Sequence, residues 1–251
     1  MRKLFFLAAV ILFIGAGPAT GQSNITNIRF GSTGDPLNGL TIGWKSQGSA
    51  DSIKWGNSPD LEKGKFLGAI STSITGTQFD YTFPTQLAGS TIYYSILDSK
   101  NGVWTEMKTY KTASDATDNQ FSFSVIGDSR SYPDKWKSIA DAVFDTDFTL
   151  FMGDIIADGD NASQWDIWFE YGDNFVSREL VYHTVGNHDS DESPSRIENY
   201  KGLYTLPGNE LYYSFTYGNA VFICLYSQTP GDVDQYNWLL STLEANNDKT
   251  W

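Results

Sequence analysis

The sequence predicts two folded domains, an all-β sandwich followed by an α/β domain. Short alternating or aromatic runs, separated by turns rich in Gly, Pro and Asn, extend over residues 22–117 without a sustained helical period. This pattern is typical of a β-sandwich. Over residues 118–251, apolar strand-like runs alternate with amphipathic segments, which predicts parallel βαβ units. A mostly polar connector at 113–119 separates the two patterns.

In the first region we expect a strand wherever an apolar or aromatic run lies between two turn signals. Asn101-Gly102 is the best hairpin signal in the chain, because both residues adopt positive φ easily and aromatic runs flank them. The expected strands cover Ile25–Phe30, Leu40–Ser46, Ser52–Trp55, Gln78–Phe83, Thr91–Leu97 and Trp104–Lys111.

In the second region three apolar runs each end in Gly followed by a polar residue. The expected strands are Phe121–Ile126, Phe148–Met152 and Leu180–Val185, with helices over 134–144 and 162–175 between them. A hairpin over Leu211–Thr216 and Ala220–Tyr226 and a helix over 235–245 complete the expected elements.

Residues 1–21 have the layout of a cleaved signal peptide. A basic start precedes the apolar run Leu4–Ile14, and the small residues Ala19 and Gly21 precede the expected cleavage point before Gln22. The run is too short to span a bilayer, which takes about 20 apolar residues. We therefore expect a periplasmic or secreted protein with no membrane attachment after cleavage.

Charge and cysteine content exclude two further classes of protein. The formal net charge is −13, and so acidic a surface repels phosphate backbones, so we expect no nucleic-acid-binding surface. The single cysteine, Cys224, lies in an apolar run. A disulfide scaffold is therefore excluded, and we expect a buried, inert thiol.

The three apolar runs of the second region place polar side chains at one edge of the expected sheet. Asp128, Asp154 and Asn187 each follow a Gly at the end of a run. One Gly-Asp alone is typical of a turn that caps the next helix. Three successive strands that each end in Gly and a polar residue, however, bring those polar residues together at the carboxyl edge of a parallel sheet. Two carboxylates and a carboxamide at one edge suit divalent cations. The pattern therefore predicts a metal site.

These residues also carry a family resemblance. Gly127-Asp128-Ser-Arg130, Gly153-Asp154-Ile-Ile-Ala-Asp158-Gly159 and Gly186-Asn187-His188-Asp189 resemble the first three motifs of the calcineurin-like metallophosphoesterases. The whole chain resembles their purple acid phosphatase branch. The resemblance implies a fibronectin-III-like β-sandwich over 22–117, followed by the N-terminal part of an αββα metallophosphoesterase domain over 118–251.

The resemblance further implies a role for each motif residue. Asp128 would bind the first metal ion, Asp154 would bridge both ions and Asn187 would bind the second. His188 would face the phosphate and protonate the leaving oxygen, and Asp189 would orient its ring. Two ions, drawn from Fe, Mn, Zn or Mg, would activate a hydroxide that attacks the monoester of a small phosphorylated substrate, as in an acid phosphatase.

The chain departs from its relatives at several positions. Arg130 and Ala157 stand where relatives place a His or a Tyr ligand. Arg130 is therefore either a contact to the substrate phosphate or an ordinary surface residue, and Asp158 either orients a ligand or belongs to a turn. We expect His183, on the third strand, to be a core or supporting residue rather than a ligand.

Three further His ligands of the family have no counterpart, because His183 and His188 are the only histidines in the sequence. We therefore expect a truncated chain whose metal shell is incomplete and which is inactive alone. Two alternatives stay open for the function. One is a phosphodiesterase or nucleotidase on the same fold, because the motifs specify the metal site and not the ester. The other is a non-catalytic binding or adhesion protein that works through its sandwich.

Overall fold

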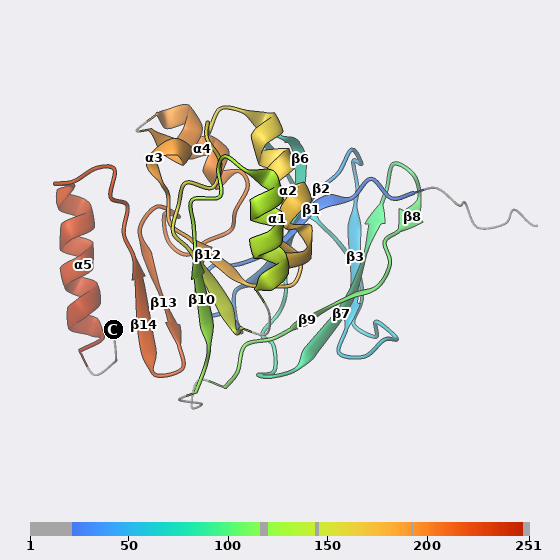
Figure 1. Cartoon of the computed structure of the whole chain (residues 1–251). Helices are drawn as coiled ribbons and strands as arrows, with labels where there is room; N and C mark the ends of the chain where they lie inside the picture. The colour runs from blue at the N-terminus through green and yellow to red at the C-terminus, as the bar shows by residue number, and fades with distance from the viewer. Residues whose placement is uncertain (1–21, 116–119, 144–145, 192, 248–251) are drawn as a thin grey trace, which may run out of the picture.

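The computed structural model describes residues 22–115, 120–143, 146–191 and 193–247. Two antiparallel sheets form the N-terminal part, and a parallel sheet with helices and a hairpin forms the rest (Figure 1). The expected leader at 1–21 lies outside the described residues. In the described part of the chain, no helix combines the length and the apolar character that crossing a membrane requires.

The first antiparallel sheet has the strand order β1-β2-β6-β5, and the second has the order β4-β3-β7, with β8 and β9 both paired to β7. The strands are β1 (Thr26–Ser32), β2 (Leu40–Lys45), β3 (Ser52–Gly56), β4 (Gly64–Leu67), β5 (Ala69–Ser73), β6 (Gly76–Thr82), β7 (Thr91–Asp98), β8 (Val103–Trp104) and β9 (Lys108–Lys111).

Aromatic side chains join these two sheets. Trp55 of β3 donates from its indole nitrogen to the hydroxyl of Tyr81 on β6 at 3.1 Å. Phe30 of β1 packs edge-on against Tyr94 of β7, with ring centroids 5.8 Å apart. The sheets therefore share one buried core. The predicted hairpin at Asn101-Gly102 is present, since residues 99–102 join β7 to β8. Of the two residues, only Gly102 has a positive φ, 68°.

The parallel sheet has the order β10-β11-β12, and α1 and α2 lie on one of its faces. Phe151 packs against Trp136 of α1 and Trp168 of α2 on that face, whereas Phe148 packs against Phe215 of the β13–β14 hairpin on the other. The elements are β10 (Phe123–Ile126), α1 (Pro133–Ala142), β11 (Phe148–Phe151), α2 (Ala162–Val176), β12 (Val181–His183), α3 (Asn187–Ser190), α4 (Pro194–Lys201), β13 (Tyr213–Tyr217), β14 (Ala220–Cys224) and α5 (Val233–Ala245).

The parallel sheet packs directly against the antiparallel sheets. Phe30 of β1 forms a parallel bridge with Leu180, just before β12, and Lys45 of β2 pairs with Asp166 of α2 at 2.7 Å. The buried apolar residues form one cluster across both parts. The hairpin and α5 lie to the left of the parallel sheet in Figure 1, and the hairpin also borders the loop at 34–37 between β1 and β2. Helix α2 is thus held between the β1–β2 edge and the parallel sheet.

Four elements were not predicted from the sequence. Strand β5 has mostly exposed side chains, and β4 alternates between half-buried and exposed residues, so neither contains a buried residue. Helix α3 is a single turn formed by motif residues, and α4 spans Pro194–Lys201 with only Tyr200 buried. Both helices lie at the end of the molecule where the parallel strands finish (Figure 1).

Candidate active site

Three loops meet at the carboxyl edge of the parallel sheet. Asp128 follows β10, Asp154 follows β11 and Asn187 begins α3 after β12. Asp128 and Asp154 have φ of 54° and 52°, a left-handed conformation that is uncommon for residues other than Gly. Such conformations persist only where the surrounding structure enforces them, and they cluster at functional sites.

Glycine is required where the ends of β11 and β12 approach each other. A Cβ atom on Gly186 would collide with the carboxylate and the backbone nitrogen of Asp154. A Cβ atom on Gly153, at φ 76°, would lie 2.6 Å from the backbone nitrogen of Gly186. The Gly that precedes each polar residue therefore allows the two loops to pack in contact.

The guanidinium of Arg130 bridges the two carboxylates. Its Nε lies 2.9 Å from Asp128 Oδ1, and its Nη1 lies 2.8 Å from Asp154 Oδ2. Its Nη2 has no hydrogen-bond partner among the described residues. Both carboxylates thus converge on one cationic group, and Arg130 is part of this edge.

His188 is held at the same edge by two backbone contacts. Its backbone N–H donates to Asp154 Oδ1 at 3.2 Å, and its ring Nδ1 lies 2.9 Å from the carbonyl oxygen of Ala157. Because a carbonyl oxygen only accepts, Nδ1 carries a proton. Nε2 therefore remains available for proton transfer, as an acceptor in the neutral ring and as a donor in the imidazolium.

Asp189 does not orient His188 in the way the family resemblance implies. Its buried carboxylate accepts hydrogen bonds from the backbone N–H groups of Ile155 (2.8 Å), Ile156 (3.3 Å) and Gly186 (2.9 Å). Burial raises the pKa of Asp189 to about 7, against the lowering effect of these three donors. Asp189 thus ties the loop after β11 to the start of α3, and the Ala157 carbonyl orients the His188 ring.

The loop between β11 and α2 is ordered by a side chain that the sequence analysis missed. Gln164 Oε1 accepts from the backbone N–H groups of both Ala157 and Asp158 at 2.9 Å. The side chain of Asn161 caps α2 by accepting from the N–H of Gln164. Asn161-Ala-Ser-Gln164 resembles a capping box, a signal that could have identified this position.

Asp158 belongs to a surface ion-pair cluster around Arg196. The Arg196 guanidinium lies 2.9 Å from Asp158, 3.3 Å from Asp160 and 3.5 Å from Asp191. The side chains of these three aspartates are between 44% and 73% exposed, so each pair contributes little to stability. The cluster joins α4 to the loop that carries Ala157.

His183 is a core residue, as expected. Its ring lies against Phe151, Trp168 and Tyr204, and it is 2% exposed. Burial lowers the pKa of His183 to about 3, so its ring is neutral at ordinary pH. Cys224 is likewise a buried free thiol.

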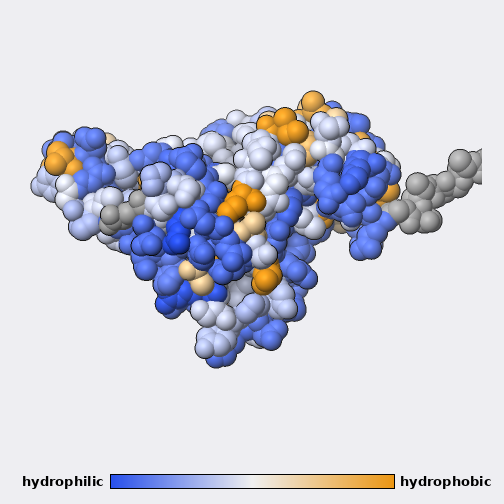
Figure 2. Space-filling model, turned by 90° about the horizontal axis from the view of Figure 1, so that it is seen from above, coloured by the Kyte–Doolittle hydropathy of each residue, from blue (hydrophilic) through white to orange (hydrophobic). Residues whose placement is uncertain are grey.

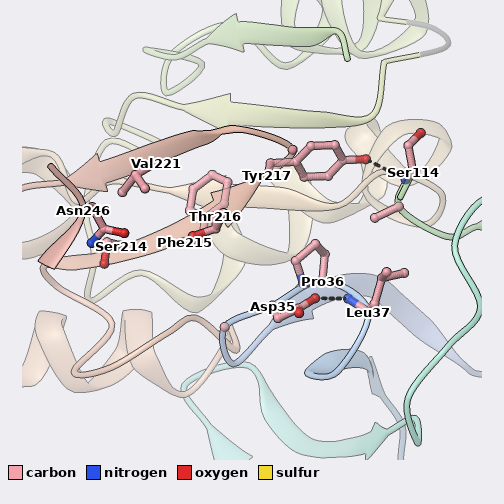
Figure 3. A pocket seen from close by; sticks show the side chains of 13 residues that line it. Asp35, Pro36, Leu37, Ser114, Ser214, Phe215, Thr216, Tyr217, Val221 and Asn246 are labelled. Carbon is pink, nitrogen blue, oxygen red and sulfur yellow. Dashed lines mark hydrogen bonds between the residues drawn. The ribbon is translucent and has the colours of Figure 1, made fainter. Parts of the chain in front are cut away.

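Two cavities differ in their relation to this edge. One of about 360 Å³ opens beside Arg130 and Ala157. Another of about 330 Å³ lies between the loop at 34–37 and the β13–β14 hairpin (Figure 3). In the second cavity the polar groups are paired with each other: Leu37 N–H donates to Asp35, and Ser114 N–H donates to Tyr217. Of these two cavities, the first is the one that adjoins the strand-end loops.

The donor set at the edge fits part of a metal site. Among the described residues, no group of three or more His, Cys, Asp or Glu side chains is placed to hold a metal ion. The edge does present the carboxylates of Asp128 and Asp154 and the carboxamide of Asn187, which are hard oxygen ligands. The guanidinium of Arg130 stands where both carboxylates converge. The space between the two carboxylates therefore holds a positive charge, here that of the Arg130 guanidinium.

The family model of the calcineurin-like phosphoesterases matches residues 121–251, more than half of the chain. The chain belongs to the calcineurin-like phosphoesterase family. Asp128, Asp154, Asn187 and His188 all lie in the matched part. A comparison with curated protein sequences returns no match.

Two solved structures resemble this calcineurin-like phosphoesterase in fold. The purple acid phosphatase PPD1 from yellow lupin (Lupinus luteus) seeds has a TM-score of 0.73 and 16% identity, covering 89% of this chain and 48% of its own. The structure of PhoD has a TM-score of 0.58 and 13% identity, covering 81% of this chain and 52% of its own. The chain thus spans about half the length of each.

Proposed function

We propose that this calcineurin-like phosphoesterase is an exported enzyme that hydrolyses phosphate monoesters with the help of two metal ions, as an acid phosphatase does. One observation carries the proposal: Asp128 and Asp154, both at positive φ, converge on one cation, and Asp154 also accepts the backbone N–H of His188. Family membership supports phosphoester hydrolysis. The likeness to a purple acid phosphatase supports the choice of monoesters.

In this proposal Asp128, Asp154 and Asn187 hold the metal ions from this part of the chain. Asp154 is the ligand shared by both ions, since its side chain is 19% exposed against 68% for Asp128 and its loop packs against the start of α3. When bound, the two cations would polarise the phosphoryl oxygens and lower the pKa of a water molecule.

The chain's own side chains supply binding and proton transfer. The backbone carbonyl of Ala157 keeps the proton of His188 on Nδ1, so the imidazolium donates its Nε2 proton to the leaving oxygen. Arg130 offers Nη2 to a phosphoryl oxygen, because a guanidinium matches phosphate geometry. The overall charge of −13 repels phosphate, and the positive charge of Arg130 offsets that repulsion at the site.

The same proposal divides the chain as the sequence analysis does. Residues 1–21 act as a signal peptide for export to the periplasm or the medium. Residues 22–117 form a fibronectin-III-like domain, which the two packed antiparallel sheets support, and residues 118–251 belong to the catalytic domain. The surface seen from above is mostly hydrophilic, with separate hydrophobic patches (Figure 2).

Hydrolysis of 4-nitrophenyl phosphate in Mn²⁺ tests this function. For the full-length protein, Asp154→Asn is expected to lower kcat/KM at least about 100-fold, and Asp128→Asn by about tenfold, because metal stabilisation of the transition state is worth several kcal/mol. Asp173→Asn, an exposed change on α2, is the control and should be neutral. Equal activity of all three variants would refute the site. If the protein turned over bis(4-nitrophenyl) phosphate faster than 4-nitrophenyl phosphate, it would be a phosphodiesterase and not a phosphomonoesterase.

A further inference from the structure

The cavity beside Arg130 has a mostly apolar wall. Its volume of about 360 Å³ falls in the range of small-molecule sites, about 300–1,000 Å³. It lies between the loop after β10, the loop after β11 and the helices α1 and α2. Among its apolar lining residues, Pro133 and Ile167 are exposed and Ala157 is half-buried, whereas Trp136, Ile155, Ile156 and Trp168 are buried.

The two buried tryptophans that underlie this cavity are held in place by stacking and hydrogen bonds. The indole rings of Trp136 and Trp168 stack with centroids 5.1 Å apart and an interplanar angle of 9°. Trp168 Nε1 donates to the hydroxyl of Ser129, which itself donates to the carbonyl of Ile155. Trp136 Nε1 donates to the carbonyl of Trp168. These bonds satisfy the polar atoms of both tryptophans, so the cavity is shaped before any ligand arrives.

Two side chains of the cavity, Gln164 and Arg130, offer unpaired N–H groups. Gln164 uses its Oε1 for two backbone N–H groups, and its Nε2 has no partner in the part of the chain that the structure describes. Arg130 contributes the free Nη2. None of the described lining residues is an Asp or Glu, so an ammonium group would find no counter-ion there. The wall therefore suits an uncharged, apolar group attached to an anion.

The cavity is continuous with the strand-end site through two residues. Arg130 lines the cavity and also contacts the carboxylates of Asp128 and Asp154. Ala157 lines the cavity, and its carbonyl oxygen holds His188. A phosphoester bound by Arg130 therefore has this cavity beside it.

We propose that this cavity binds the organic part of the substrate, and that the substrate is a phosphoester of an uncharged, apolar alcohol such as a phenol or a branched alkanol. This inference rests on the proposed function, because it places the phosphate at the strand-end site. Ile167 is the specificity-determining residue that can be changed with least effect on folding, since it lies on α2 and is 39% exposed.

Binding of phosphonates, which are not hydrolysed, tests the cavity separately from catalysis. Calorimetry on the full-length protein should show 1-naphthylmethylphosphonate binding at least about tenfold more tightly than methylphosphonate. Ile167→Asn should remove about tenfold of that preference by introducing a polar group into the wall, and Ile167→Ala should remove less. Ile139→Asn, on α1 and 47% exposed but outside the cavity lining, should change neither affinity.

The outcomes separate the two proposals. Equal affinity for the two phosphonates, no binding of the naphthyl compound, or equal effects of Ile167→Asn and Ile139→Asn would overturn the cavity assignment. If the protein bound the naphthyl compound selectively but hydrolysed no phosphoester, the cavity proposal would be supported and the enzymatic function would be refuted. Hydrolysis of naphthyl phosphate and methyl phosphate with the same kcat/KM would support the function and contradict the substrate class.

Discussion

Replacement of Asp189 by alanine is expected to lower the free energy of unfolding by about 3–5 kcal/mol. The substitution leaves the N–H groups of Ile155, Ile156 and Gly186 without their acceptor, and each unsatisfied buried donor costs about 1–3 kcal/mol. Because those bonds tie the loop after β11 to α3, the positions of Asp154 and His188 should also loosen. Urea unfolding followed by tryptophan fluorescence measures the loss.

Two further variants serve as comparisons for the stability loss of Asp189→Ala. Asp189→Asn keeps an acceptor for the two isoleucine N–H groups but turns an amide N–H₂ toward Gly186, so its loss should be intermediate. Asp173→Ala removes an exposed carboxylate whose distance to Lys108 is 3.8 Å, and it should cost less than about 1 kcal/mol. An Asp189→Ala protein as stable as Asp173→Ala would show that the buried carboxylate does not organise the loops.

Replacement of Arg130 by alanine is expected to tighten Mn²⁺ binding about tenfold. The carboxylates of Asp128 and Asp154, which would hold the metal ion, are paired with the guanidinium, so an incoming cation must displace it. Removing a competing charge at about 4 Å relieves roughly 1–4 kcal/mol, depending on the local dielectric, and 1.4 kcal/mol is a factor of ten. Calorimetric titration with Mn²⁺ measures the change.

Arg196→Ala is the matched control for this experiment. It removes the same charge from a neighbouring set of aspartates, Asp158, Asp160 and Asp191, without touching the strand-end carboxylates. Its Mn²⁺ affinity should stay within about twofold of the unchanged protein. A similar gain in both variants would mean that only long-range charge is at work, and no gain in Arg130→Ala would mean that the metal does not use this carboxylate pair.

The placement of Asp128, Asp154 and Asn187 could be predicted from the sequence. Each follows a Gly at the end of an apolar run, and the carboxyl ends of parallel strands meet at one edge. The same reasoning identified the paths of β10, β11 and β12. The apolar and aromatic runs between turn signals located most strands of the antiparallel sheets, but they could not locate β4 and β5, which contain no buried residue.

The contacts that complete the site could not be predicted, because they depend on atoms without a sequence signature. The group that orients His188 is the backbone carbonyl of Ala157, and any residue supplies a carbonyl. Asp189 was assigned to His188 by resemblance, whereas its carboxylate caps three backbone N–H groups. The bridge made by Arg130 requires both loops to be placed in three dimensions.

The most direct test of a metal-dependent phosphoesterase site at this edge is the location of Mn²⁺ by anomalous scattering in crystals of the full-length protein. We expect an anomalous peak within coordination distance of the Asp154 carboxylate, with Asp128 and Asn187 as neighbouring oxygen ligands and the Arg130 guanidinium moved off the carboxylate pair. The metal site would be wrong if the peak lay elsewhere in the molecule and Arg130 stayed paired with Asp128 and Asp154 at saturating Mn²⁺.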